Sequence, residues 1–191
     1  MTARRILCAA ASLSLVVATA QAAEVRGRVL VDGRPAAGIA VAILPFEDGF
    51  ERSRREARGE DEPRPLAEGL TGKGGSFRIA LATSGSTGAM PVRVEFSGGG
   101  SAPHRLGKLV DASGEDLGDV RLAPAAALAG RVVDARGGPV VDATVRLWAG
   151  RGGRPGDRLT AVEPVPQVTS TGPDGTFRFD AASDIGNRIR I

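Results

Sequence analysis

The chain has 191 residues, of which 42% are hydrophobic, so it is long enough for one or two packed domains. Its 25 basic and 22 acidic residues nearly balance, and the basic residues are scattered among acids without interleaved aromatic side chains. This composition excludes the basic footprint of a nucleic-acid-binding protein, so we expect no nucleic-acid partner.

The N-terminus has the pattern of a cleavable signal peptide. Arg4 and Arg5 precede an apolar run over residues 6–20, and small residues stand at Ala20 and Ala22, the positions that a signal peptidase reads. The run is shorter than the roughly 20 apolar residues that a membrane anchor needs. We therefore predict a signal peptide over residues 1–22 and export to the periplasm, the cell surface or the medium. No membrane span is expected after the signal peptide is removed.

The only cysteine, Cys8, lies within the predicted signal peptide. The exported chain then has no disulfide, and burial alone must hold its fold.

Two parts of the chain repeat one another at a spacing of roughly 100 residues, the size of a domain. Residues 27–29 (Gly-Arg-Val) match residues 130–132, and residues 71–79 match residues 171–179. Within the matched blocks, apolar residues alternate with polar or small ones, as in half-buried strands. We expect Phe77, Ile79 and Leu81 to face one core, and Phe177 and Phe179 to face another.

Aspartate and glycine mark the predicted turns between these strands. Asp32, Asp134 and Asp174 are interpreted as turn formers whose side chains bond their own backbone, and Gly175 is expected to need a positive φ. Residues 51–64 hold five acids and five arginines, which predicts a solvated, mobile loop with partner contact as its functional alternative. Short strands separated by turns favour an all-β antiparallel sandwich.

Residues 130–147 (GRVVDARGGPVVDATVRL) and 171–179 (TGPDGTFRF) resemble carboxypeptidase regulatory-like domains, and residues 117–122 (LGDVRL) are similar to the closing strand of that family. The resemblance implies tandem transthyretin-like (prealbumin-like) sandwiches, a shape grouped with carbohydrate-binding-like folds. It places the first domain at residues 23–123 and a second, C-terminally incomplete domain at residues 124–191. It does not imply catalysis.

The second copy stops before its final strand or two. An unfilled sheet position leaves unpaired backbone groups and an exposed apolar flank. Either the sequence is a fragment of a longer protein, or a partner supplies the missing strand by augmentation. In both cases we expect proteases to spare residues 23–124 and to degrade the region that follows, unless that region self-associates.

Catalytic, cofactor and metal sites are not expected. A zinc or serine hydrolase needs histidine, and the only one, His104, lies in a glycine-rich stretch over residues 98–104 that predicts a surface loop. No calcium-loop motif of the D-x-D-x-D-G type is present. Lys73 and Lys108 lie in a different copy from the only asparagine, Asn187, which excludes an intramodule isopeptide crosslink of the lysine–asparagine type.

These observations favour a non-catalytic structural or protein-interaction module, with other envelope proteins or glycans as its partners. One alternative is weak carbohydrate binding, for which Trp148 is the candidate contact because it alternates away from the apolar residues of its predicted strand. The other alternative is an accessory, regulatory domain of a peptidase whose catalytic part is elsewhere.

The signal peptide yields a direct prediction. Cleavage after Ala22 leaves Ala23 as the mature N-terminus, and mass spectrometry of the exported protein measures this mass. Recovery of Met1, or of a lipid on Cys8, would contradict both the topology and the localisation.

Overall fold

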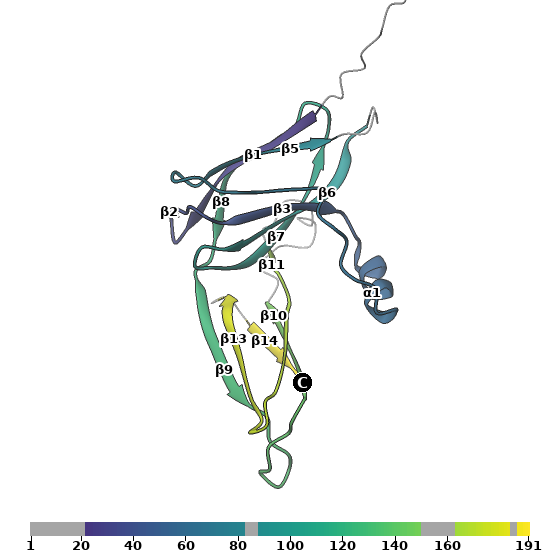
Figure 1. Ribbon diagram of the computed structural model, residues 1–191, viewed down its shortest axis with the longest axis vertical. Helices are drawn as coiled ribbons and strands as arrows, with labels where there is room; N and C mark the ends of the chain where they lie inside the picture. Colours follow the sequence, from purple (N-terminus) through teal and green to yellow (C-terminus); the bar gives the residue numbers. More distant parts are fainter. Residues whose placement is uncertain (1–21, 83–87, 150–162, 184–186) are drawn as a thin grey trace, which may run out of the picture.

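The computed structural model describes residues 22–82, 88–149, 163–183 and 187–191 (Figure 1). Within these residues the chain is almost entirely β-structure, with a single helix that is neither long nor apolar enough to cross a membrane. The predicted signal peptide, apart from Ala22, lies outside the described residues. The all-β prediction is confirmed.

The N-terminal unit consists of two packed sheets. The strands of one sheet are β1 (Ala22–Val31), β2 (Arg34–Pro35), β5 (Ser76–Ala82) and β8 (Glu115–Leu122). Those of the other are β3 (Ala40–Pro45), β4 (Ala67–Leu70), β6 (Met90–Gly98), β7 (Ser101–Val110) and β11 (Glu163–Pro164). In the first sheet β1 pairs antiparallel with β5 and parallel with β8. The second sheet is antiparallel throughout, in the order β11-β7-β6-β3-β4.

Both sheets contribute to one core, as a β-sandwich requires. Phe77, Ile79 and Leu81 on β5 are at most 4% exposed, while Arg78 between them points to solvent, which confirms the predicted alternation. The ring of Phe77 meets that of Phe96 on β6 edge to face, with 6.0 Å between ring centroids. This aromatic pair connects the two sheets.

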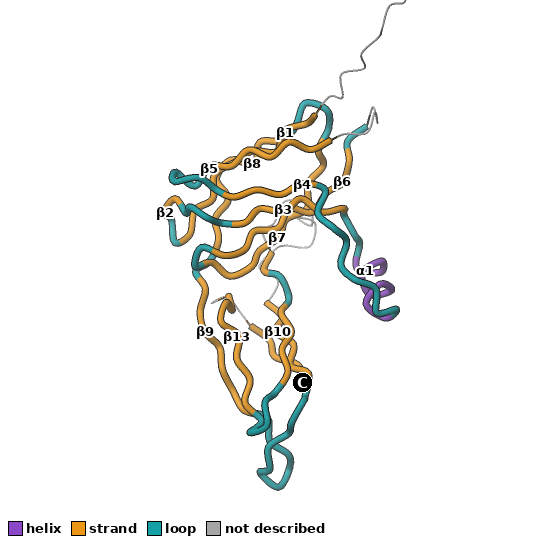
Figure 2. The backbone as a smooth tube through the Cα atoms, viewed as in Figure 1, coloured by secondary structure: helices purple, strands orange, loops and turns teal. Residues whose placement is uncertain are grey.

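The C-terminal unit is smaller and repeats the arrangement (Figure 2). Its strands are β9 (Ala125–Arg131) and β13 (Thr176–Ser183) in one sheet, and β10 (Thr144–Ala149), β12 (Gln167–Ser170) and β14 (Asn187–Arg190) in the other. β9 pairs with β13, and β10 lies between β12 and β14. Val145, Leu147, Phe177, Phe179 and Ala182 form its buried core, as predicted for the two phenylalanines.

A threonine hydroxyl closes the same loop in both units. Thr71 Oγ1 donates to the carbonyl of Ala36, and Thr171 Oγ1 donates to the carbonyl of Val140, each at 2.7 Å. Each hydroxyl also accepts a backbone N–H, at 3.0 Å in the first unit and 2.9 Å in the second. The repeat in the sequence is therefore matched by a repeat in hydrogen bonding.

Asp134 and Asp174 bond the backbone of their own turns, as predicted. Asp134 Oδ1 accepts the backbone N–H groups of Arg136 and Gly138, both at 2.8 Å, and Asp174 Oδ1 accepts from the hydroxyl and N–H of Thr176. These bonds, the hydroxyl bond most strongly, lower the pKa of Asp174. Asp32 adopts a positive φ of 50° in its turn.

The prediction that residues 51–64 form a solvated loop is wrong for the first half of the segment. Helix α1 (Gly49–Ala57) occupies it. Balanced charges without an apolar stripe predicted no helix, but Arg55 of the helix pairs with Glu47, which also meets Arg93 on β6, and these ion pairs hold the helix in place.

The prediction that His104 is an exposed loop residue is also wrong. β7 begins at Ser101, directly after the glycine turn, and His104 is only 4% exposed on that strand. Its Nδ1 lies 2.6 Å from the carbonyl oxygen of Ala102, a contact that satisfies one ring nitrogen inside the fold. The glycine run is therefore only a tight reversal between two strands and not a long loop.

Gly75 and Gly175 provide a matched stability test. Both have a positive φ, 75° and 77°, which confirms the prediction for Gly175, and an added Cβ would lie 2.5 Å from Val29 O or 2.6 Å from Val132 O. We expect Gly75→Ala and Gly175→Ala each to lower the free energy of unfolding of its unit by about 2 kcal/mol or more. Urea denaturation measures this loss.

Gly74→Ala is the control for this test, because an added Cβ at Gly74 meets open space. It should leave the denaturation midpoint near that of the parent protein. Equal midpoints for Gly75→Ala and Gly74→Ala would contradict the steric account.

Candidate functional site

The segment between β3 and β4 folds into a capped helix on the side of the first sandwich (Figure 1). Asp48 Oδ1 accepts the backbone N–H groups of Phe50 and Glu51, both at 2.8 Å, and Glu51 Oε2 accepts the N–H of Asp48 at 3.2 Å. This reciprocal pattern is a capping box, and it satisfies N–H groups that the first helical turn leaves without partners. It fixes where α1 begins.

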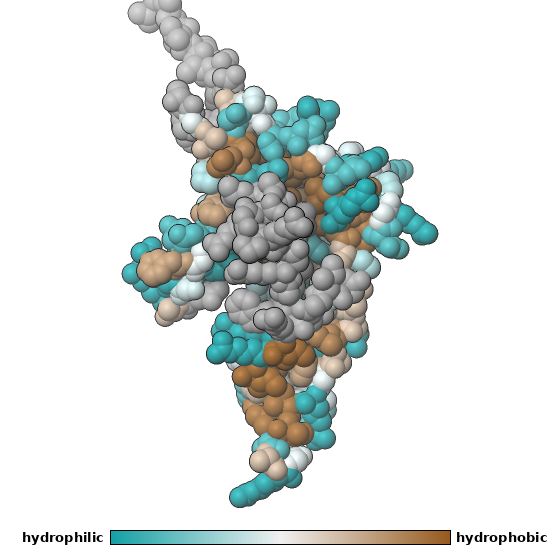
Figure 3. Space-filling view, turned by 180° about the vertical axis from the view of Figure 1, so that it is seen from behind, coloured by the Kyte–Doolittle hydropathy of each residue, from teal (hydrophilic) through white to brown (hydrophobic). Residues whose placement is uncertain are grey.

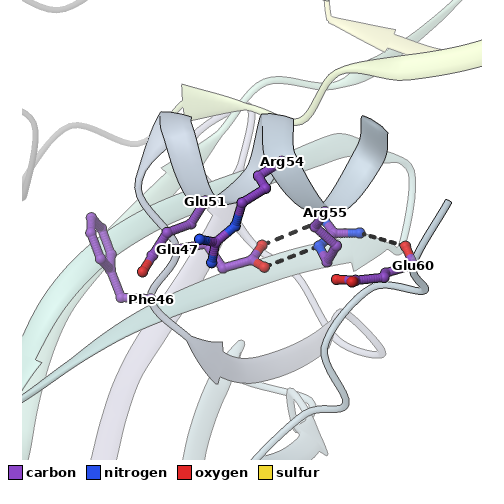
Figure 4. Close-up of a pocket in the computed structure, with 6 residues that line it drawn as sticks. All are labelled: Phe46, Glu47, Glu51, Arg54, Arg55 and Glu60. Atoms are coloured by element: carbon purple, nitrogen blue, oxygen red, sulfur yellow. Dashed lines mark hydrogen bonds and ion pairs between the residues drawn. The ribbon is translucent and has the colours of Figure 1, made fainter. Parts of the chain in front are cut away.

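An ion pair attaches the helix to the end of β3. Arg55 Nε donates to Glu47 Oε1 at 3.0 Å, and Arg55 Nη2 donates to Glu47 Oε2 at 3.4 Å (Figure 4). The side chains of Arg55 and Glu47 are only 12% and 15% exposed. Arg55 Nη1 also donates to the carbonyl of Glu60, so the same guanidinium holds the chain beyond the helix. A bidentate pair shielded from water is geometrically specific.

A buried arginine on the sheet completes the attachment. Arg93 on β6 has a side chain that is 5% exposed, and its Nη1 lies 3.6 Å from Glu47 Oε2. Its Nε lies 2.9 Å from Glu95 Oε1, in an ion pair that lacks hydrogen-bond geometry. Glu47 therefore bridges one arginine of the helix and one of the sheet. Removing such a bridge leaves a buried charge without compensation.

Glu95 has a perturbed pKa. Burial is the main cause and raises the pKa of its carboxyl above the ordinary value of 4.5. The nearby carboxylate of Glu62 adds to the rise, while the guanidinium groups of Arg93, Arg105 and Arg52 oppose it. Residues from α1, from the following loop and from the sheet thus converge on one half-buried charged cluster.

Next to this cluster the surface is hollowed. A cavity of about 270 Å³ is lined by Phe46, Glu47, Glu51, Arg54, Arg55 and Glu60. Figure 4 shows Glu47 and Arg55 between Phe46 on one side of the hollow and Glu60 on the other. Phe46 is 38% exposed, and Phe50 on the first turn of α1 is 73% exposed. The site therefore combines exposed aromatic rings with fixed charges of both signs.

Five of the six side chains that line this hollow are charged. Glu47 and Arg55 pair with each other, and none of the described residues that line the cavity carries a hydroxyl, thiol or imidazole group. No cluster of three or more metal-ligating side chains occurs among the residues described. Exposed aromatic rings with flanking arginines are typical of the contact residues of protein–protein interfaces.

Trp148, the candidate carbohydrate contact, lies on β10, where its backbone pairs with Arg188 of β14. Its side chain is outside the described part of the chain, so its role as a sugar contact stays a prediction.

Two features of the site escaped sequence reasoning. Asp48 and Glu51 have the three-residue spacing of a capping box, which is a readable signal for the start of a helix. Arg93 stands between Val92 and Val94 on a strand, and alternation indicates that its side chain points outward. Alternation does not indicate that the segment between β3 and β4 buries this side chain. Only the folded arrangement shows that Glu47 and Arg93 meet.

No protein-family model and no curated protein matches the chain. Solved structures similar to it include the shaft pilin SpaA of Lactobacillus rhamnosus GG, with 14% identity over 82% of this chain and 81% of that one and a TM-score of 0.35. A streptococcal ancillary pilin has 14% identity over 85% of this chain and 51% of its own, also at 0.35. A DUF3823 family protein of Parabacteroides merdae has 14% identity over 88% and 83%, at 0.31. These likenesses are weak, and the fold described above does not depend on them.

The raised pKa of Glu95 predicts a pH dependence of stability. The folded state holds this proton more tightly than the unfolded state, so the free energy of unfolding is higher below pH 4.5 and falls as the pH rises through the window above it. Glu95→Gln removes this fall. Urea midpoints of the variant should therefore depend less on pH than those of the parent protein.

Glu68→Gln is the matched control. Glu68 and Glu95 both pair with Ala42, from opposite sides, and so share one sheet face, but Glu68 is exposed. Its variant should keep the parental pH profile. Parallel profiles for Glu95→Gln and the parent protein would show that burial of Glu95 does not influence stability.

Proposed function

We propose that this chain is an exported, non-catalytic β-sandwich protein that uses the insert over residues 46–64 to bind another protein. One observation carries the proposal. Half-buried ion pairs between Glu47, Arg55 and Arg93 hold α1 in a fixed place, while Phe50 on that helix remains 73% exposed. A large exposed ring on a positioned helix suits an interface anchor.

The proposal includes the organisation of the chain. The two units are copies of a carboxypeptidase regulatory-like module, with bounds at residues 23–123 and 124–191, and the second copy is shorter. The matched bonds of Thr71 and Thr171 support this, as do the equivalent glycines Gly75 and Gly175. The predicted signal peptide over residues 1–22 supports a periplasmic, cell-surface or secreted location.

A photocrosslinking experiment tests the interface. A photoreactive phenylalanine analogue replaces Phe50, and an identical analogue replaces Leu70, which is similarly exposed at 68% but lies on the edge strand β4. In the cells that make the protein, we expect one defined adduct from position 50 and none from position 70. Arg55→Ala should reduce the adduct at least about threefold, because the helix loses its bidentate attachment.

Equal adducts from both positions, or none from position 50, would overturn the interaction site. The carbohydrate alternative has its own test on a glycan array. Glycan binding that Trp148→Ala abolishes, without crosslinking at position 50, would favour that alternative over the protein-interaction role.

A further inference from the structure

β1 and β9 hold equivalent places in the two units but have different neighbours. Gly27 on β1 pairs with Phe77 on β5, and Gly130 on β9 pairs with Phe177 on β13, so the two pairs share one register. The other side of β1 is covered by β8, which runs parallel to it. Among the described residues, no strand pairs with the other side of β9.

The uncovered side of β9 coincides with incomplete burial. Val25 and Val29, the inward residues of β1, are 0% exposed, and two apolar residues of β8 belong to the same core. Their counterparts, Leu128 on β9 and Val132 directly after β9, are only partly buried. Figure 3 shows apolar side chains gathered on the surface of the lower part of the molecule, which is the C-terminal unit. Within the described ranges, no strand gives the second core the apolar cover that β8 supplies in the first.

In the first unit, an ion pair joins β1 to β8, the strand that covers its edge. Arg28 Nε donates to Asp119 Oδ1, and Arg28 Nη2 donates to Asp119 Oδ2, both at 2.8 Å. This bidentate pair fixes the register between β1 and β8. Arg131 stands at the position of Arg28, and its Nε donates to the carbonyl of Asp174 at 2.8 Å. The carboxylate of an incoming segment would accept hydrogen bonds from the Nη groups of Arg131.

The sequence of β9 is unlike that of a protected edge. Edge strands are commonly blunted by charges or proline, but residues 125–130 are Ala-Ala-Ala-Leu-Ala-Gly. A second copy of this strand is a poor partner, because its only charged residue is another Arg131 and it carries no acid. The β8 strand of a second copy is already paired with its own β1. Neither strand of a second copy therefore matches this edge, whereas a partner segment that carries an acidic and an aliphatic residue complements it.

We propose that the free edge of β9 accepts one extended segment of another polypeptide, added parallel to β9. The segment carries a carboxylate opposite Arg131 and an aliphatic residue opposite Val132, as Asp119 and Val120 stand opposite Arg28 and Val29. Backbone hydrogen bonds supply affinity, and the carboxylate and aliphatic positions supply specificity. This surface is separate from α1. A negative result for binding at β9 would therefore not contradict the proposed interface at α1, and the reverse also holds.

A peptide with the sequence of residues 113–124, which include β8, is the probe. Labelled with a fluorophore and mixed with the purified 191-residue chain, it should bind in fluorescence anisotropy, and hydrogen exchange should show new protection of the amides of residues 125–131. Arg131→Glu should weaken binding at least tenfold. A peptide with Asp119→Lys should bind this variant better than the parent peptide does. A peptide with Val120→Pro should lose binding, because proline removes a backbone donor.

Arg131→Gln provides a second variant that removes the charge without reversing it, and circular dichroism checks that both variants fold. Arg28→Glu tests whether the peptide displaces β8 from β1 in the first unit instead of binding to β9. If that change, and not Arg131→Glu, weakens binding, or if the protection appears on residues 22–31, the proposal is overturned. Absence of peptide binding overturns it as well. Concentration-dependent protection of β9 without peptide would also overturn it, because a second copy would then be the occupant.

Discussion

Close packing of a phenylalanine ring over a glycine is the constraint on which both units depend. A Cβ added at Gly27 would lie 3.2 Å from the Phe77 ring, and one added at Gly130 would lie 2.6 Å from the Phe177 ring. The bare backbone of each glycine leaves room for the ring that packs against it. In the first unit the ring then reaches Phe96 in the opposite sheet. In the second it meets Phe179 of its own strand, with 5.9 Å between ring centroids.

The outer face of the first sandwich is organised by charge. Glu95 on β6 lies opposite Arg105 on β7 in the strand register. Arg93 lies two residues before Glu95 on β6, on the same face of the sheet. A buried arginine is costly unless carboxylates surround it, and the insert supplies one of them through Glu47. Held by ion pairs, α1 needs no apolar face of its own, and its aromatic residue stays available on the surface. The charge cluster thus connects the stability of the insert to its proposed role in recognition.

Sequence reasoning recovered what depends on local alternation and turn chemistry. The buried faces of β5 and β13 follow from period-two patterns, and the bonds of Asp134 and Asp174 follow from short-range geometry. It failed where distant segments decide the outcome. The position of α1 depends on a contact between Glu47 and Arg93, and the burial of His104 depends on β7 starting directly after a glycine turn. Neither effect has a signature within one window of sequence.

The joint between the units covers one sheet edge of the first sandwich. β11 follows β10 in the chain, yet it pairs with β7 of the first unit, and Val165 N donates to the carbonyl of Pro103 at 2.8 Å. Without β11, β7 would be the edge strand of its sheet. This short strand therefore covers an edge that could otherwise pair with a strand of another chain. The same segment then cannot cover the edge of β9. A strand from the smaller unit thus protects the larger core. In the described part of the chain, β9 has β13 as its one strand neighbour and lies beside the less buried core.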